Sequence, residues 1–310
     1  MRIKDLIKRK LSGKDALAFD GANGTGKIEF EELLWAVASV IDVGHVGVHN
    51  ALYRGKDITS YFEDESLYAR LNGTSGFKPY EDLFVGDYIR MPHKVCVVGD
   101  DCDGAGTNIV KIAGFNPHWK NYWSGNTLTK PHLDLIPDRN FGDCQPMNDS
   151  ATTVGGYKNC KMNKTIIGAP ATSGKTNGTI NEQLYNIFGS HLQTYRELVS
   201  SAMDPARYNR FGQATGASSS WEWIEVQAIL MSEIEVYGSV VWGSSGYDIG
   251  TAKNQLPIFR LNTADLINSE YYWLRDVASA ESFCLVNYDG IACYCNADGE
   301  YYLRPRFTIA

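Results

Sequence analysis

The clearest hydrophobic periodicity lies in the segment INEQLYNIFGSHLQTYRELV, residues 180–199. Apolar residues recur there at steps of three and four, which is typical of one face of an α-helix. A second segment, SSSWEWIEVQAILMSEIEVYG (residues 218–238), has a capping-box spacing between Ser219 and Glu222 and ends at Gly238, where a C-cap glycine is expected. The pattern therefore predicts two consecutive helices, over 180–199 and 218–238.

After Gly238 the apolar runs become short, and the period is that of strands. The runs are SVVWG, LPIFRL, YYWLRDV, SFCLV, IACYC and YLRPRFTI. Asp289-Gly290 and Asp298-Gly299 separate the last of them and indicate hairpins with type I′ turns, which need positive φ at both central residues. We therefore expect a multi-stranded antiparallel sheet, whose last strand has Leu303, Pro305, Phe307 and Ile309 on one side and Arg304, Arg306 and Thr308 on the other.

The chain before residue 180 divides into further parts. In residues 1–45 the segment KIEFEELLWAVASVI has helical spacing, which predicts a short helical arm for attachment or oligomerisation. Residues 46–150 are short apolar runs broken by Gly, Asn, Asp and Pro, typical of a β-rich, irregular region. Residues 151–310 are predicted to be the main domain, and residues 46–150 are either part of that domain or a separate region. Two helices before a closing sheet make the predicted class α+β.

Composition excludes several classes of function. The 310 residues are 44% hydrophobic and carry a formal net charge of -7, and only KDLIKRKLSGK near the start is basic. Binding of nucleic acid through phosphate neutralisation is therefore not expected as the main role. Asp15 and Asp20 follow this basic start, and no apolar run has the length of a membrane span. We expect no signal peptide, no membrane insertion, and synthesis in the cytoplasm.

The cysteines and histidines do not form a site that is evident from their spacing. The seven cysteines show no CxxC pairs, so we expect free thiols rather than a disulfide framework. Cys293 and Cys295 share a strand face, a geometry open to metals, but no third ligand lies nearby in the sequence. His191 is predicted to be a hydrogen-bonded core histidine. No nucleophile, base and orienting acid come together.

Three loops mimic known ligand-binding motifs. Residues 169–176 fit a relaxed phosphate loop with Lys175 and Thr176, after a short apolar run at 165–167, but the next helix begins too late to reach the phosphates. Residues 21–32 mimic a calcium loop without its first carboxylate, and residues 100–104 concentrate three carboxylates. Plain surface loops are favoured in all three cases. No cofactor is expected, and a structural Ca²⁺ has no support.

Several longer segments resemble one known family. They are NALYRGKDITSYF, FVGDY, MNDSATTVGGY, FGSHLQTYREL, WEWIEVQAILMSEIEVYGSVVWGSSGYDIG, QLPIFRL, YYWLRDVASAESF and the closing LRPRF, which together extend over residues 48–310. They are similar to phage and prophage variable proteins of diversity-generating retroelements, of the major-tropism-determinant type, with a C-type-lectin-like (formylglycine-generating-enzyme-like) fold. The chain departs from that pattern at Leu303, and in the segment DDCDGAGTNIVKIAGFNPHWKNYWSGN.

The resemblance implies a constant scaffold with exposed positions that are rewritten by adenine-directed mutagenesis. The usual variable codon, AAY, cannot become Lys, Glu, Gln, Met or Trp. Every residue in 282–298 is reachable, whereas Glu281 and Glu300 are not. Cysteine is one of the products of AAY, which accounts for the three cysteines between residues 284 and 295.

The implied variable region is about 281–302, and the residues in and around it divide into two sets. The implied ligand-binding set is Cys284, Leu285, Tyr288, Asp289, Ile291, Cys293, Tyr294, Cys295, Asn296 and Asp298. The implied scaffold set is Trp273, Arg275, Phe283, Val286, Gly290, Ala292, Arg304 and Pro305. Tyrosines would supply contact area, with Asn and Asp for adaptable hydrogen bonds. An apolar hairpin packed in a core is the alternative, and the place of Tyr301 and Tyr302 stays open.

The resemblance implies a non-enzymatic receptor-binding protein of a phage particle, at a tail or head fibre tip. It would bind a host-surface protein or glycan, attach to phage structural proteins through the N-terminal arm, and form a homo-oligomer, for which we expect a trimer. Two enzymes remain as alternatives: a nucleotide-dependent one using Lys175 and Thr176, or a formylglycine-generating-type oxidase using Cys293 and Cys295. A structural virion protein without a ligand is a third.

Overall fold

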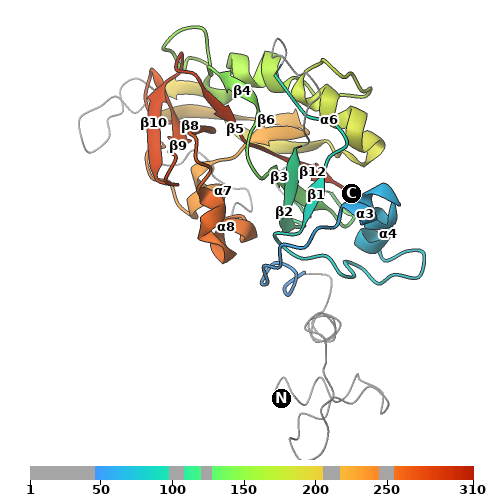
Figure 1. The fold of residues 1–310 in the computed structure, drawn as a ribbon. Coiled ribbons are helices and arrows are strands. Elements are labelled where there is room, and N and C mark those ends of the chain that lie inside the picture. Colours follow the sequence, from blue (N-terminus) through green and yellow to red (C-terminus); the bar gives the residue numbers. More distant parts are fainter. Residues whose placement is uncertain (1–45, 98–107, 120–127, 205–216, 244–254) are drawn as a thin grey trace, which may run out of the picture.

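The computed structural model describes residues 46–97, 108–119, 128–204, 217–243 and 255–310 (Figure 1). Within these ranges the fold is mixed α and β, with extensive sheets and short helices, as the sequence predicts. The expected N-terminal arm, the loop that mimics a calcium site and the three carboxylates at 100–104 lie outside the described residues.

The strands form two five-stranded sheets and one ribbon. The first sheet has the order β1-β2-β3-β12-β7, and neighbouring strands in it are antiparallel. The second has the order β10-β9-β8-β11-β4, in which β11 and β8 are parallel. The first sheet comprises β1 (Tyr88–Arg90), β2 (Ile109–Phe115), β3 (Leu133–Pro137), β7 (Ala228–Leu230) and β12 (Pro305–Ile309). The second comprises β4 (Phe141–Gln145), β8 (Tyr272–Val277), β9 (Ser282–Val286), β10 (Ala292–Asn296) and β11 (Tyr301–Leu303).

Short helices and the ribbon complete the fold. The helices are α3 (Thr59–Glu63), α4 (Ser66–Asn72), α5 (Gly156–Asn159), α6 (Ile180–Phe188), α7 (Glu233–Tyr237) and α8 (Pro257–Leu261). The ribbon pairs β5 (Tyr195–Asp204) with β6 (Ala217–Val226). Figure 1 shows β9 and β10 at one end of the molecule and α3 and α4 at the other. Strands from before and after residue 150 lie in both sheets.

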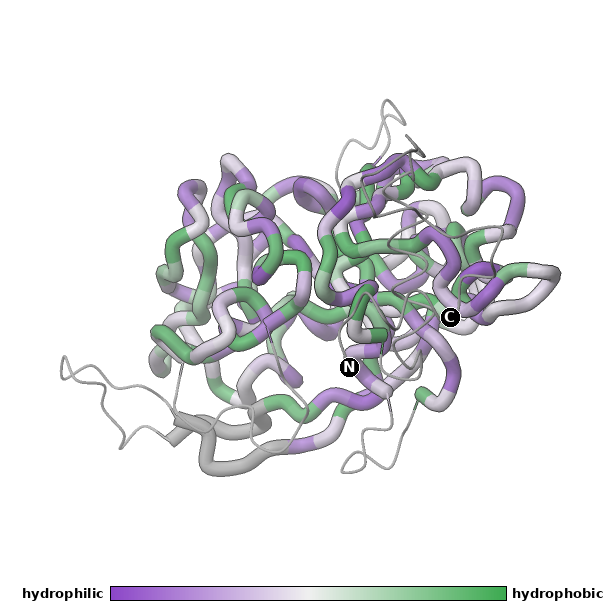
Figure 2. Tube along the Cα trace, turned by 90° about the horizontal axis from the view of Figure 1, so that it is seen from below, coloured by the Kyte–Doolittle hydropathy of each residue, from purple (hydrophilic) through white to green (hydrophobic). Residues whose placement is uncertain are grey.

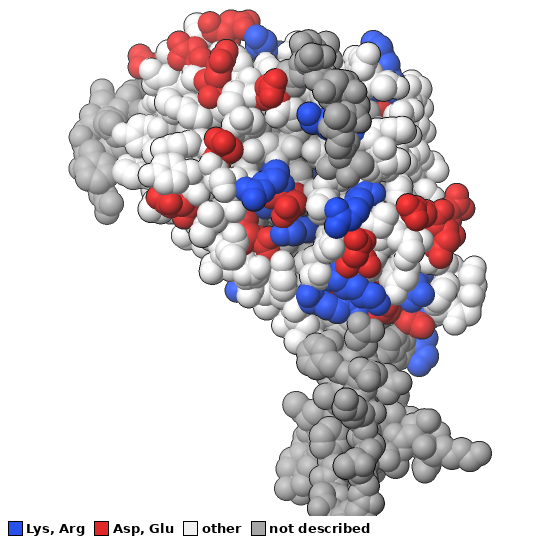
Figure 3. Space-filling view, in the orientation of Figure 1, with Lys and Arg blue, Asp and Glu red and all other residues white. Residues whose placement is uncertain are grey.

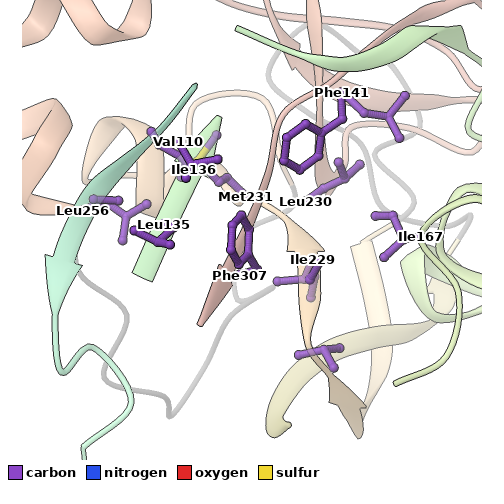
Figure 4. Close-up of a cluster of buried hydrophobic side chains, with 14 of the residues drawn as sticks. Val110, Leu135, Ile136, Phe141, Ile167, Ile229, Leu230, Met231, Leu256 and Phe307 are labelled. Atoms are coloured by element: carbon purple, nitrogen blue, oxygen red, sulfur yellow. The ribbon is translucent and has the colours of Figure 1, made fainter. Parts of the chain in front are cut away.

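The main core lies around β12, between the sheets and α6 (Figure 4). Phe307 packs between Phe141 and Phe188, at ring-centroid distances of 6.4 and 5.3 Å. Hydrophobic stretches recur along the strands, whereas hydrophilic residues are common in the outer connections (Figure 2). Both sides of β12 are buried, including Arg306 and Thr308, so the expected alternation does not mark a solvent-facing side.

The first predicted helix ends eleven residues early. It begins at a capping box formed by Thr179 and Glu182, and it stops at Phe188 because Gly189 has φ +55°. Residues 195–204 are a strand, in which buried Tyr195, Glu197 and Val199 alternate with half-buried side chains. The apolar residues Tyr195, Leu198 and Val199 have helical spacing, whereas the strand buries Glu197, whose carboxylate pairs with Arg306. The hydrophobic pattern therefore indicates the wrong period at this point.

The second predicted helix is wrong over most of its length. Residues 217–226 and 228–230 are strands, and only Glu233–Tyr237 is helical. The capping box is formed by Ser232 and Glu235 rather than by Ser219 and Glu222. The predicted C-cap at Gly238 is confirmed, because its φ is +78°.

The closing sheet is largely as predicted, with four corrections. LPIFRL is helical because Pro257 is at the first position of α8, and SVVWG is not a strand. Asp289-Gly290 does connect paired strands, but only Gly290 has positive φ, so the turn is not type I′. Asp298-Gly299 leads into β11, which pairs with β8 and β4 instead of β10. That connection is therefore not a hairpin.

A buried charge cluster joins the two sheets. The Glu235 carboxylate lies between Arg275 of β8, with Nη1 at 2.6 Å from Oε2, and Arg306 of β12, with Nη2 at 2.8 Å from Oε1. Arg306 also pairs with Glu197, and its Nη1 lies 3.4 Å from Asp134 Oδ2. All five side chains are buried. Coulombic attraction to Glu235, Tyr195, Glu197 and Asp134 outweighs burial and raises the pKa of Arg306, so the cluster remains charged.

Replacing Arg306 with methionine should destabilise the fold strongly. Arg306→Met leaves three buried carboxylates without the guanidinium, and breaking a buried pair in this way costs about 3–5 kcal/mol. The measurement is the urea midpoint at pH 7. Arg90→Met removes an exposed ion pair with Asp57 and is the control, for which we expect little change. Equal midpoints for the two variants would contradict a structural role for the cluster.

Candidate binding face on the C-terminal hairpin

The C-terminal hairpin comprises β9, β10 and the turn between them. Its register pairs Cys284 with Tyr294 and Leu285 with Cys293. Because β9 is covered by β8 on one side and β10 on the other, β10 is the outer strand of this sheet. Side chains of β9 are buried, whereas those of β10 are half-buried or exposed.

Asn287 organises the turn of the hairpin. Its side-chain oxygen accepts hydrogen bonds from the amides of Asp289 (3.0 Å) and Ile291 (2.8 Å). The Gly290 amide donates to the Asn287 carbonyl (2.9 Å), and Gly290 has φ +80°. This local bonding leaves the Tyr288 and Asp289 side chains on the outside of the turn. The preference of asparagine for such turns is a signal that could have identified Asn287 from the sequence.

A row of aromatic rings extends from this turn into the core. Tyr288 contacts Tyr271 with ring centroids 5.6 Å apart, and Tyr271 contacts Tyr301 at 5.5 Å. Tyr301 meets buried Trp273 edge-on at 5.0 Å, and its hydroxyl donates to Cys295 Sγ at 3.2 Å. That hydrogen bond, with burial, raises the pKa of Tyr301 to about 12. Tyr301 therefore joins the scaffold to the surface, and Tyr271 belongs to this face although the sequence did not single it out.

Most of the implied ligand-binding residues are accessible. Tyr288 is 50% exposed and Ile291 is 61% exposed, and Ile267, which was not predicted, lies beside the turn at 54%. Asp289, Asn296 and Asp298 are exposed, whereas Cys293, Tyr294 and Cys295 are half-buried. We refer to Tyr271, Tyr288, Ile291, Cys293, Cys295 and Tyr301, with Ile267, as the hairpin face.

Cys284 and Leu285 are not displayed, and their expected exposure is wrong. They are 0% and 1% exposed because β9 is an inner strand of the sheet. Burial raises the pKa of the Cys284 thiol strongly, and the nearby Glu233 carboxylate raises it further. These two residues belong to the core. The alternative interpretation, an apolar hairpin packed in a core, therefore describes β9 but not β10.

The implied scaffold residues form the interior of the same end of the molecule. Trp273, Arg275, Phe283, Val286, Arg304 and Pro305 are buried, and Gly290 and Ala292 are half-buried. Arg304 donates to the carbonyls of Pro137 (3.0 Å) and Asp265 (2.6 Å). Its guanidinium therefore satisfies main-chain acceptors at the end of β3 and in the 3-10 helix Thr263–Leu266 rather than facing solvent.

The surroundings of the hairpin face are sparsely charged. On the surface seen in Figure 3, Lys and Arg lie mainly away from β10, and the area around that strand is largely uncharged with scattered carboxylates. Glu270 and Glu300 flank Tyr302 and Cys144, and both carboxylates are exposed. Aromatic side chains with few charges at the centre are typical of contact surfaces.

The motifs of the alternative functions are not assembled. Residues 162–167 are a π-helix instead of the short strand expected before a phosphate loop, and Lys175 and Thr176 are exposed in the loop before α6. In the part of the chain that the structure describes, no three His, Cys, Asp or Glu side chains are placed to hold a metal ion. No described helix has both the length and the apolar character to cross a membrane.

Two further sequence predictions concern His191 and the cysteines. His191 is hydrogen-bonded as predicted, with Nδ1 donating to the Ala310 carbonyl at 2.9 Å, but it is only half-buried and stacks on Tyr68. Cys144, Cys160, Cys284, Cys293 and Cys295 have free thiols, whereas Cys96 is disulfide-bonded, so the prediction of free thiols is wrong there.

Comparison of the chain with family models, curated proteins and solved structures finds no match.

The burial of the free thiols predicts their reactivity. Burial raises the pKa of Cys160 to about 12 and raises that of Cys284 well above the usual range. Since the thiolate is the reactive form, Cys293 and Cys295 should be alkylated at pH 8 at least about tenfold faster than Cys160 and Cys284. Peptide mass spectrometry after brief iodoacetamide treatment measures the four rates. Equal labelling of Cys284 and Cys293 in native buffer would show that β9 is not buried.

Proposed function

We propose that the protein is a non-enzymatic receptor-binding protein of a phage particle. It has a C-type-lectin-like fold, and it recognises a host-surface protein or glycan through the hairpin face. A diversity-generating retroelement rewrites accessible residues of that face. The N-terminal arm attaches the protein to phage structural proteins, and the protein acts as a homo-oligomer, a trimer, on the virion.

One observation carries this proposal: the segment that resembles a variable region folds as an outer hairpin whose turn is exposed. Tyr288 and Ile291 project at 50% and 61% exposure from a turn held by main-chain bonds and by Asn287. Exposure of large apolar side chains to water is unfavourable when no partner is bound. The same side chains supply contact area when a partner binds. The resemblance of the flanking segments links this arrangement to diversified binding.

The most direct test is the nucleotide sequence of the gene and its flanks. The proposal expects a near-copy of the 3′ end nearby, which differs from the gene mainly at adenines of the copy, together with a reverse-transcriptase gene. The differences should fall in codons 288–298 and spare those for Trp273 and Arg275. If the flanks hold no such copy, diversification by a retroelement is ruled out.

Substitutions in the hairpin face should weaken cell binding without unfolding the protein. We expect the fluorescently labelled protein to bind intact cells of the bacterial strain that carries the gene or of close relatives, measured by flow cytometry. Tyr288→Ala with Ile291→Ala removes two exposed contact side chains and should weaken binding by at least about tenfold, as truncation of central interface residues does. Val154→Ala, at a residue that is 76% exposed elsewhere, is the matched control. Loss of binding in the control alone, or failure of the unmodified protein to bind any of these cells, would contradict the proposal.

A further inference from the structure

A buried carboxylate beside the hairpin holds a loop by its main chain. Glu233, the first residue of α7, is 0% exposed. Its Oε2 accepts hydrogen bonds from the amides of Val241 (2.8 Å), Trp242 (3.0 Å) and Gly243 (2.8 Å), and its Oε1 lies 3.0 Å from the Trp242 nitrogen. Three consecutive N–H groups therefore converge on one side chain, as in the backbone nests that bind anions.

The same carboxylate faces the central strands of the second sheet. The Glu233 amide donates to Asp276 Oδ2 of β8 at 2.6 Å, which fixes the start of α7 against that strand. The carboxylate also lies close enough to the Cys284 thiol of β9 to raise its pKa, after burial itself. A buried charge needs compensation, and the convergent amides of residues 241–243 supply it. This loop is consequently tied to the core of the hairpin.

Trp242 connects this loop to β10. Its indole N–H donates to the Ala292 carbonyl at 3.0 Å, and its ring lies against that of Tyr294 at 5.0 Å. A second hydrogen bond runs from the Tyr237 hydroxyl, at the end of α7, to the Gly290 carbonyl at 3.2 Å. Both hydrogen bonds reach the hairpin at main-chain carbonyls, so neither depends on the side chains at residues 291, 293 or 295.

We propose that Glu233 is a positioning residue for the hairpin face. It fixes residues 241–243, and Trp242 in turn fixes β10 against β9. The inference rests on the proposed function only in taking the hairpin face as the binding surface. It explains how the main chain of that face is held when the side chains at residues 291, 293 and 295 change, because the hydrogen bonds from Tyr237 and Trp242 are accepted by main-chain carbonyls.

The test uses thiol labelling of the full-length protein, with no ligand. Glu233→Gln keeps the size of the side chain but turns one acceptor oxygen into a donor that faces main-chain N–H groups. Residues 241–243 should detach, and the iodoacetamide rates of Cys293 and Cys295 should rise about tenfold, which corresponds to a local opening of the outer strand. The rate of buried Cys160, which lies outside this sheet, should stay unchanged.

Further variants separate positioning from general destabilisation. Trp242→Phe retains a ring against Tyr294 but loses the hydrogen bond to Ala292, and it should raise the same two rates severalfold. If Glu233 acts through Trp242, the double variant should show a smaller increase than the product of the two single effects. Val236→Ala lowers global stability from the same helix, and it should raise the rate of buried Cys160, which reacts through unfolding, while the rates of half-buried Cys293 and Cys295 stay nearly unchanged.

Two results would overturn the inference. One is an unchanged rate at Cys293 and Cys295 in both Glu233→Gln and Trp242→Phe. The other is a rise in Glu233→Gln that is equal at Cys160, since that is global unfolding, together with no effect of Trp242→Phe. Neither result bears on cell binding by the unmodified protein. Conversely, local opening in a protein that binds no cells would support the positioning role and contradict the proposed function.

Discussion

The architecture depends on one carboxylate, that of Glu235, between two buried arginines. Arg275 comes from the middle of one sheet and Arg306 from the other, so each sheet supplies a cation to the same anion. Only Arg304 separates β11 from β12, which means that the chain passes from one sheet to the other within a single residue. The path of the chain at this crossing has one conformation only if the side chains on both sides of it are fixed. Charge-assisted hydrogen bonds provide that directionality where apolar packing alone does not.

This arrangement separates the frame of the hairpin from its surface. Glu235 fixes α7 to both sheets, and two residues earlier Glu233 fixes the following loop to α7. β9 is consequently held on every side, whereas β10 is held by its pairing to β9 and by hydrogen bonds at main-chain carbonyls. Apart from Tyr294, which packs against Trp242, and Cys295, which accepts a hydrogen bond from Tyr301, the side chains on the outer strand contribute little to this frame. A binding surface that changes in sequence needs this division of roles.

The sequence predicted the class of fold and most strands of the closing sheet, because alternation and Gly-rich turns are local signals. It failed at residues 195–204, where the apolar positions have helical spacing and pairing with a strand that is 13 to 31 residues away decides the structure. It also did not predict that Arg306 is buried. The acidic partners Asp134, Glu197 and Glu235 come from three separate elements, and no local pattern records that they converge.

Two independent criteria decide which hairpin residues can vary: whether the residue type can arise from an AAY codon, and whether the side chain is exposed. Neither criterion identifies the variable residues alone. Cys284 is reachable by diversification, but it lies at 0% exposure against Glu233. Gly290 is also of a reachable type, yet a Cβ there would lie 3.1 Å from that of Leu266 in a backbone with φ +80°. A side chain at Gly290 would therefore strain the turn that displays Tyr288 and Ile291. Diversification is compatible with this fold only if the codons of such positions lack the adenines that mutate, so the packing of the hairpin restricts which codons the template can contain.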